Sequence, residues 1–370
     1  MILPKTLPSS MHGVQLLGHG GFDKLVYRQD LPVPLPDFGD VLIQVSAAGV
    51  NNTDINTRIG WYSKSVTTDT EAGGSDGFAM VDDEDASWMG VPLKFPRIQG
   101  ADICGRIIGV GAGVDPARIG ERVLVQTMQP LRDATQMTCM TIGSEYDGGF
   151  AQYAVAKSEF TFAVNCDWSD AELATIPCAY STAENMLERA NVRMETILVT
   201  GASGGVGSAA VQLAKRRGAR VIALTSAGKR QAVMLLGADQ VIDREADIIA
   251  VLKTETIDVI IDLVGGPSWP RLLEVLKRGG RYITAGAIAG PMVELDVRTL
   301  YLKDLTLLGA TYQDDEIFPN LISYIEAGEI GPTLAATYQL SDIARAQVDF
   351  LAKKYTGKLV LLPPTIGDKT

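Results

Sequence analysis

The strongest chemical signal in the sequence is a glycine-rich turn within residues 196–225, TILVTGASGGVGSAAVQLAKRRGARVIALT. Glycines at this spacing between an apolar strand and a helix let backbone N–H groups approach a pyrophosphate, and the helix dipole favours its charge. The pattern predicts a dinucleotide site, although a tight turn without a ligand is the alternative interpretation. The expected contact residues are Ala202, Gly204, Gly205, Val206 and Gly207.

The second strand of this unit ends without the acidic residue that would hold the ribose 2′-hydroxyl of NAD. Its end reads LTSAGKR, in which Ser226 can hydrogen-bond a 2′-phosphate while Lys229 and Arg230 neutralise it. Arg244, after the next expected strand, falls on the same rim. We therefore expect NADPH as the cofactor. The alternative is that Lys229 and Arg230 are only the solvated start of a helix.

The elements that must position these residues are strands and helices that alternate from about residue 196 to RYITAG at 281–286. This alternation predicts an α/β fold, a doubly wound parallel sheet with helices on both faces. The loops after the carboxyl ends of such strands form the ligand crevice. The residues expected to contact the nicotinamide half through their backbone are Val264, Gly265, Gly266, Gly286 and Ala287.

Residues 1–165 have a different pattern, with short strands separated by Gly, Pro and Asp as in a folded-over antiparallel domain. The tail GKLVLLP is another expected strand. We predict a nucleotide-binding domain at 166–312, inserted into a β-rich domain made of 1–165 and 313–370. Within the first part, residues 63–95 carry seven acidic residues against two lysines and are predicted to be a polar surface loop.

The composition excludes several classes of protein. A chain of 370 residues is too long for a single small binding module. Its formal net charge of -11 creates no general attraction for nucleic acid or anionic lipid, so the expected partner is a small molecule. Glycines interrupt the uncharged stretch 196–214, which argues against a membrane span. Four scattered cysteines and the lack of a secretory signal at the N-terminus favour a cytoplasmic location.

Further motifs occur along the chain in a characteristic order. They are Gly49-Val50-Asn51-x-x-Asp54, Gly100-Ala101-Asp102-x-x-Gly105, Gly120-Glu121-Arg122-Val123, Asp147-Gly148-Gly149-Phe150-Ala151-x-Tyr153, the glycine turn, Gly237-Ala238-Asp239, Val264-Gly265-Gly266, Gly279-Gly280-Arg281 and Gly357-Lys358. Over nearly its whole length the sequence resembles the medium-chain dehydrogenase/reductase superfamily. The resemblance implies a Rossmann domain inserted into a GroES-like catalytic domain, and it adds Lys358 to the expected cofactor contacts.

The same resemblance implies that zinc is absent. Alcohol dehydrogenases of the superfamily bind a catalytic zinc through a Cys, a His and a further Cys, and the matching positions here are Asn51, Ala101 and Cys178. Two of the three ligands are therefore missing. The lobe that holds a structural zinc in the family contributes only Cys139 where four cysteines are needed.

The remaining pattern is similar to the zinc-free quinone oxidoreductase branch, in which Asn-x-x-Asp begins the site, here Asn51 and Asp54. That branch and the related enoyl thioester reductases carry a tyrosine eleven residues after the Asn, and Tyr62 matches it. Two features depart from the branch: Arg244 stands where it usually has Tyr, and the acidic insertion 63–95 is longer than the usual connection. The family commonly forms dimers through an edge strand of the cofactor sheet, so a homodimer is expected.

Chemistry without a metal favours reduction of a conjugated acceptor. Dehydrogenation of a simple alcohol needs an alkoxide, which a metal or a strong base must stabilise. Hydride transfer from NADPH to a quinone or enone places negative charge on a remote oxygen of the acceptor, so it needs only hydrogen-bond donors at that oxygen. The candidate catalytic donors are Tyr62, the Asn51 amide and the Thr182 hydroxyl. Alternatively, Tyr62 packs under the insertion, Thr182 contacts only the cofactor, and Asp54 caps or braces the Asn51 loop.

The sequence thus predicts an NADPH-dependent, zinc-independent oxidoreductase that transfers hydride to a quinone or an activated alkene. An enoyl thioester reductase acting on a CoA or ACP substrate is the alternative enzyme, although the acidic insertion would repel the phosphates of coenzyme A. An NADPH-binding protein without turnover is the alternative from another class.

Overall fold

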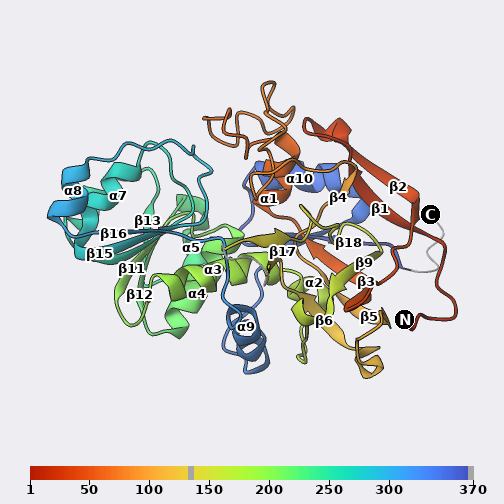
Figure 1. Cartoon of the computed structure of the whole chain (residues 1–370). Coiled ribbons are helices and arrows are strands. Elements are labelled where there is room, and N and C mark those ends of the chain that lie inside the picture. Colours follow the sequence, from red (N-terminus) through yellow and green to blue (C-terminus); the bar gives the residue numbers. More distant parts are fainter. Residues whose placement is uncertain (132–136, 366–370) are drawn as a thin grey trace.

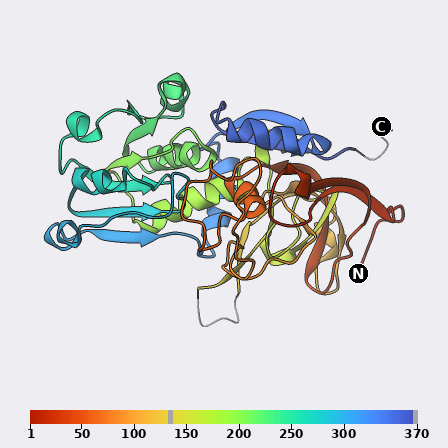
Figure 2. The ribbon, with the colours of Figure 1, turned by 90° about the horizontal axis from the view of Figure 1, so that it is seen from above.

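The computed structural model describes residues 1–131 and 137–365. Figure 1 shows a parallel sheet flanked by helices on one side of the molecule and a β-rich part on the other. Seen from above in Figure 2, the green-to-cyan part of the chain and the red-to-yellow part lie at opposite ends, and the N-terminus lies at the β-rich end.

A six-stranded parallel sheet contains the glycine turn. Its strand order is β13-β12-β11-β14-β15-β16, and every neighbouring pair is parallel. This confirms the predicted doubly wound sheet. The strands are β11 (Thr196–Val199), β12 (Arg220–Thr225), β13 (Gln240–Asp243), β14 (Ile257–Asp262), β15 (Leu276–Thr284) and β16 (Thr306–Gly309). The helices between them are α4 (Gly205–Arg216), α5 (Arg230–Leu235), α6 (Ile248–Leu252), α7 (Trp269–Val275) and α8 (Val297–Leu302).

Both faces of this sheet are covered, which explains why its strands are apolar throughout. In β11, Ile197 and Val199 belong to the core cluster on one face, whereas Leu198 belongs to the cluster on the other, and all three are fully buried. Successive residues of a strand point to opposite faces, so a strand buried on both faces shows no polar alternation.

The β-rich part is built around a second sheet with the order β10-β6-β5-β3-β18-β17, in which β9 also pairs with β3. Its strands are β3 (Asp40–Gly49), β5 (Cys104–Val110), β6 (Arg122–Val125), β9 (Tyr153–Lys157), β10 (Thr161–Ala163), β17 (Leu334–Gln339) and β18 (Lys358–Leu362). The C-terminal strand β18 pairs antiparallel with β3, so the tail of the chain completes the N-terminal sheet. Smaller sheets contain β1 (Ser10–Leu16), β2 (Leu25–Pro32) and β4 (Arg97–Ile98), and β7 (Met128–Pro130) with β8 (Cys139–Thr141).

The other helices lie outside the parallel sheet. They are α1 (Asn52–Ile59), α2 (Asp170–Leu173), α3 (Pro177–Arg189), α9 (Ile317–Glu326) and α10 (Ile343–Leu351). One core cluster contains Leu124 and Val360 of the β-rich sheet together with Tyr180 of α3 and Val211 of α4. Because the two parts share this continuous core, the proposed domain 166–312 is not an isolated unit.

The acidic insertion is only partly the polar surface loop that its composition predicts. Residues 63–95, all of which are described, form no helix or strand, and Asp82, Asp83 and Glu84 are exposed as expected. Thr70 and Ala86, however, are buried, at 4% and 0% exposure. The acidic composition of the segment does not predict these contacts, because they are made by small residues that lie between the acidic ones and pack against the rest of the molecule. Figure 1 shows the insertion as an orange loop beside α1.

A buried arginine anchors this insertion. Arg58 of α1 is fully buried and donates to Gly74 O in the insertion, to Gly20 O and to Gln347 Oε1 of α10, at 2.7, 2.8 and 2.8 Å. Its guanidinium also lies over the ring of Phe22, 4.3 Å from the centroid. The insertion is therefore a packed segment with a defined position. None of the described helices has the length and apolarity needed to span a bilayer.

Candidate active site

The glycine turn lies at the carboxyl end of β11, where α4 begins. Gly204 is the N-cap residue of α4, and no side chain among the described residues caps it. The first N–H groups of a helix have no partner inside the helix, so an uncapped end suits an anion. A Cβ at Gly207 would lie 2.2 Å from Gly201 O, which explains why helix and strand can pack only with glycine there. Ala202 is buried behind the turn, and Val206 packs against the core.

Two other loops meet the turn at the same edge of the sheet. A Cβ on Gly201 would contact Val264, and one on Gly265 would lie 3.2 Å from the Cβ of Ala287. The structure thus brings together the loops after β11, β14 and β15, including Gly266 and Gly286. Asp262 positions them: it is fully buried and accepts hydrogen bonds from the backbone of Val264 and Gly265, at 3.0 and 3.1 Å.

The expected 2′-phosphate rim lies at the ends of β12 and β13. Ser226 directly follows β12, and Arg244 N donates to Thr225 O at 2.9 Å, which places Arg244 beside it. Lys229 Nζ donates to Tyr355 O at 2.7 Å. Burial lowers the pKa of Lys229, and the nearby Arg244 and Lys353 lower it further. The positive charges of Arg244 and Lys353 thus disfavour the charged form of Lys229.

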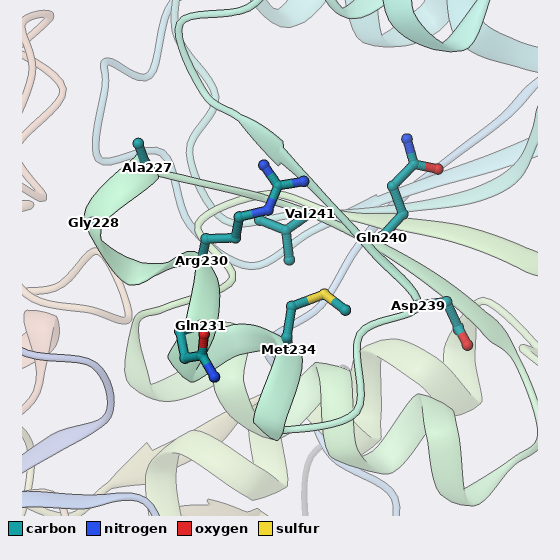
Figure 3. Close-up of a pocket in the computed structure, with 8 residues that line it drawn as sticks. All are labelled: Ala227, Gly228, Arg230, Gln231, Met234, Asp239, Gln240 and Val241. Carbon is teal, nitrogen blue, oxygen red and sulfur yellow. The ribbon is translucent and has the colours of Figure 1, made fainter.

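Arg230 lies beside the same rim and is exposed. Its side chain lies in a pocket of about 490 Å³ between α5 and β13, and Figure 3 shows it extending toward Val241. The pocket is lined by Ala227, Gly228, Arg230, Gln231, Met234, Asp239, Gln240 and Val241. The neighbouring Lys229 ammonium is instead bonded to Tyr355 O. The role of Arg230 in binding the 2′-phosphate stays a prediction.

A buried polar cluster connects the turn to Asn51. Lys358 Nζ donates to Asp102 Oδ2 at 2.6 Å and to Asn51 Oδ1 at 2.5 Å. Asn51 Nδ2 also donates to Asp102 Oδ2, at 2.8 Å. The Lys358 side chain is 2% exposed and that of Asp102 is not exposed at all. A Cβ on Gly205 would lie 2.7 Å from Lys358 Cδ, so this lysine lies directly against the turn.

Two carboxylates hold the backbone around Asn51. Asp54 accepts from Asn51 N at 2.8 Å and from Gly100 N at 3.2 Å, so it braces the loop at the start of α1. Burial raises the pKa of Asp54 to about 7. Asp102 accepts from Cys178 N at 2.6 Å, which ties the cluster to the first turn of α3.

Tyr62 and Thr182 lie around this cluster. The Tyr62 hydroxyl donates to Thr53 Oγ1 at 3.2 Å, and its ring stacks on Trp88 of the insertion with centroids 6.3 Å apart. Burial raises the pKa of Tyr62 to about 12, and the nearby Cys178 and Asp54 add to the rise. The Thr182 hydroxyl contacts the Cys178 thiol, whose own pKa is raised by burial and by Asp102. Tyr62 thus packs under the insertion, while its hydroxyl lies near the residues of the cluster.

Sequence reasoning missed the roles of Asp102 and Asp262. Asp102 was visible only as part of a motif, and Asp262 as the last residue of an apolar strand. A carboxylate at an expected buried position indicates that hydrogen-bond donors or a cation surround it, because it needs such partners to offset the cost of leaving water. Trp88 was visible as an aromatic residue in an otherwise acidic segment.

The side chains at the zinc-ligand positions of the family do not suit zinc. Asn51 Oδ1 is bonded to the Lys358 ammonium, and Ala101 offers no ligand atom. A zinc ion there would face a cation already held by Asp102. Across residues 1–131 and 137–365, no group of three or more His, Cys, Asp or Glu could hold a metal ion. Catalytic zinc sites use three His, Cys or carboxylate ligands, so the donor set here does not fit.

Comparisons with known proteins agree with this architecture. The family model of the alcohol dehydrogenase GroES-like domain matches residues 37–165, and that of zinc-binding dehydrogenases matches 205–327. The chain is 30% identical to the acryloyl-coenzyme A reductase of Metallosphaera sedula, over 95% of this chain and 99% of that protein. It is 29% identical to the human quinone oxidoreductase, over 95% and 98%.

A solved structure supports the same assignment. A candidate alcohol dehydrogenase from Sinorhizobium meliloti 1021 has 45% sequence identity and a TM-score of 0.88, covering 97% of this chain and 98% of that one. Family models, full-length relatives and fold therefore agree. The chain belongs to the medium-chain dehydrogenase/reductase superfamily, as an oxidoreductase of the quinone oxidoreductase-like type.

Proposed function

We propose that this oxidoreductase transfers hydride from NADPH to a quinone or an activated alkene, without zinc. The observation that carries the proposal is the contact of Lys358 with Asn51 and Asp102, directly against the glycine turn. A fixed cation replaces the metal of the alcohol dehydrogenases at this place. Such a site suits an acceptor that develops negative charge on an oxygen during the reaction.

The residues that would hold NADPH divide into three groups. The uncapped start of α4 suits the pyrophosphate, and the loops that contain Val264, Gly265, Gly286 and Ala287 suit the nicotinamide half. Ser226, Lys229 and Arg244 suit the 2′-phosphate, because Arg244 lies close enough to Lys229 to lower the pKa of that lysine. When bound, NADPH supplies the hydride.

The protein's own part is to stabilise the negative charge that develops on the acceptor oxygen. With a pKa near 12, Tyr62 remains protonated at neutral pH and can donate a hydrogen bond to the developing oxyanion. Asn51 keeps one N–H in a long contact with Gly49 O, 3.4 Å, so that N–H is available to a better acceptor. Lys358 uses two of its three N–H groups on Asn51 and Asp102, and its charge favours negative charge nearby.

The Thr182 hydroxyl is a further hydrogen-bond donor near the cluster. It is 9% exposed and follows Cys178 by one turn of α3. A hydroxyl at this position can donate either to the acceptor or to the cofactor ribose. We therefore assign it to the donors around the reacting atoms, together with Tyr62 and Asn51.

An enoyl thioester reductase is the second candidate, because a reductase of acryloyl-coenzyme A is a full-length relative. The acidic insertion 63–95 disfavours it, since its side chains would repel the phosphates of coenzyme A. We also propose a homodimer and a cytoplasmic location. The edge strand β16 supports the first, and four cysteines without a disulfide support the second.

A screen of NADPH consumption separates these candidates. Protein purified without added zinc is assayed against quinones, enals, enones and enoyl thioesters, with NADPH and with NADH. We expect turnover with quinones or simple conjugated carbonyl compounds, with NADPH preferred. Turnover confined to enoyl thioesters would assign the second candidate, and NADPH binding with no oxidation by any acceptor would assign the chain to non-catalytic binders.

A further inference from the structure

A carboxylate of the acidic insertion holds a lysine at the rim assigned to the 2′-phosphate. Lys353 follows α10, and its Nζ lies 2.5 Å from Glu71 Oε1. The two side chains are 37% and 65% exposed, respectively. Figure 1 shows α10 next to α1 and the insertion, and Leu351 of α10 also approaches Gly74.

Lys353 belongs to a segment that follows the expected cofactor path. Two residues after it, the carbonyl of Tyr355 accepts from Lys229 Nζ at 2.7 Å. Gly357 N then donates to Ser203 O of the glycine turn, at 3.0 Å. Lys358 lies against Gly205. The segment 353–358 therefore runs from the 2′-phosphate rim to the pyrophosphate turn.

Three cations converge at the first end of this segment. Lys353 and Arg244 both lower the pKa of Lys229, after the larger effect of its burial. Each of these two residues has a carboxylate partner, Glu71 for Lys353 and Glu245 for Arg244. A phosphate arriving here would meet two lysines and an arginine, and it would also approach the Glu71 carboxylate.

The contact made by Glu71 is linked to the other end of the cofactor site. Asp69 Oδ1 accepts from Glu71 N at 2.9 Å and from Ala72 N at 3.0 Å, which makes residues 69–72 one tight turn. In the same turn, Thr70 donates to Ile288 O through its N, at 3.1 Å, and through its Oγ1, at 3.3 Å. Ile288 directly follows Ala287, in the loop assigned to the nicotinamide half.

We propose that Glu71 competes with the 2′-phosphate of the cofactor for Lys353, so that NADPH, unlike NADH, detaches the turn 69–72 from Lys353. The proposal rests on the NADPH preference proposed above. An exposed lysine–carboxylate pair is weak, whereas a phosphate has more charge and three strong acceptor oxygens. Glu71 and the phosphate also repel each other, so both cannot be held closely by Lys353 without cost.

Lys353 is then a specificity-determining residue, and the insertion responds to the cofactor that is bound. Release of Glu71 loosens the turn that Thr70 attaches to the nicotinamide-side loop. The anchor at Arg58 and Gly74 is not part of this turn, so the rest of the insertion stays in place.

Cofactor dissociation constants test the competition. NADPH and NADH are titrated into the wild type, Glu71→Gln, Lys353→Ala and the double variant. We expect the dissociation constant of NADPH to fall about threefold in Glu71→Gln, as for removal of a weak competing pair. In Lys353→Ala we expect it to rise about tenfold. Adding Glu71→Gln to Lys353→Ala should then have no further effect. NADH affinity should not change, and the exposed control variants Glu84→Gln and Lys354→Ala should match the wild type.

Hydrogen exchange supplies a readout that does not depend on affinity. Backbone amides of residues 69–72 should exchange faster with saturating NADPH than with saturating NADH. If the wild type prefers NADPH but Glu71→Gln binds NADPH more weakly than the wild type or equally well, the proposed competition between Glu71 and the phosphate is wrong. The proposed cofactor is then unaffected. Equal wild-type affinity for the two cofactors would instead overturn the proposed cofactor itself.

Discussion

Lys358 and Asp102 are 256 positions apart in the sequence, yet their side chains form an ion pair of 2.6 Å with almost no exposure. The pair joins β18 to the loop before β5. Because Asp102 also accepts from Cys178 N, it reaches the start of α3 as well. One carboxylate therefore holds together three segments around the candidate site, namely β18, the loop before β5 and the start of α3.

The first prediction concerns this pair. Lys358→Met keeps most of the side-chain volume but leaves Asp102 buried without its cation. We expect the free energy of unfolding to fall by about 3 to 5 kcal/mol, as for a broken buried ion pair. Urea unfolding measures the change, with the exposed Lys354→Met as the control. Adding Asp102→Asn to Lys358→Met should recover part of the lost stability. If Lys358→Met alone is as stable as the wild type, the ion pair contributes little to stability.

The second prediction distinguishes two neighbouring cations. Lys229→Ala should weaken NADPH binding by about 1 to 3 kcal/mol, the value of a charge-assisted contact, with little change for NADH. Arg230→Ala is the matched control, because its side chain lies in the pocket between α5 and β13. Fluorescence titration of each cofactor gives the constants. A loss of NADPH affinity in Arg230→Ala as large as in Lys229→Ala would show that both side chains bind the 2′-phosphate.

The third prediction tests Tyr62 as a donor. Tyr62→Phe keeps the ring that stacks on Trp88 and removes only the hydroxyl. We expect kcat and kcat/KM to fall together by about 100-fold, since one donor to an oxyanion in a desolvated site is worth about 3 kcal/mol. Thr53→Val removes the present partner of the hydroxyl and should have a smaller effect. If chemistry limits the rate and Tyr62→Phe keeps the wild-type kcat, Tyr62 has only a packing role.

The fourth prediction is a pH dependence of stability. Burial raises the pKa of Asp54 from 3.8 to about 7, so the folded state binds this proton more tightly than the unfolded state. The stabilisation is fully present below pH 3.8 and is lost as the pH rises to about 7. Asp54→Asn should flatten this decrease, which amounts to at most about 4 kcal/mol. Urea unfolding between about pH 5 and about pH 8 measures it, with the exposed Asp83→Asn as the control. An unchanged slope in Asp54→Asn would assign the dependence to other groups.

Local patterns made most of the fold predictable. The glycine turn between β11 and α4, and the alternation of strands and helices after it, depend on residues close in sequence. Contacts between distant residues were not predictable in this way. Nothing local indicates that Arg58 donates to Gly74 and Gln347, which attaches the insertion to α10.

The candidate site shows the same division. Asn51, Tyr62 and Lys358 were identified from motifs, but their arrangement was not. The buried Asp102 joins Asn51 to Lys358, and its partners come from three separate segments. At the rim, spacing suggests that Lys229 and Arg230 act together, whereas in the structure Lys229 is bonded to Tyr355 O and Arg230 lines a neighbouring pocket. Periodicity predicts which face a residue occupies, not which of two adjacent long side chains reaches a ligand.

The most direct test of zinc-free hydride transfer is one single-turnover measurement. Protein treated with a chelator and shown to lack zinc is saturated with NADPH and mixed in a stopped-flow instrument with the best acceptor from the screen. The account predicts stoichiometric oxidation of the bound NADPH at the rate of the untreated protein, with a slower rate when the transferred hydrogen of NADPH is deuterium. Loss of oxidation after chelation, restored by added zinc, would contradict it.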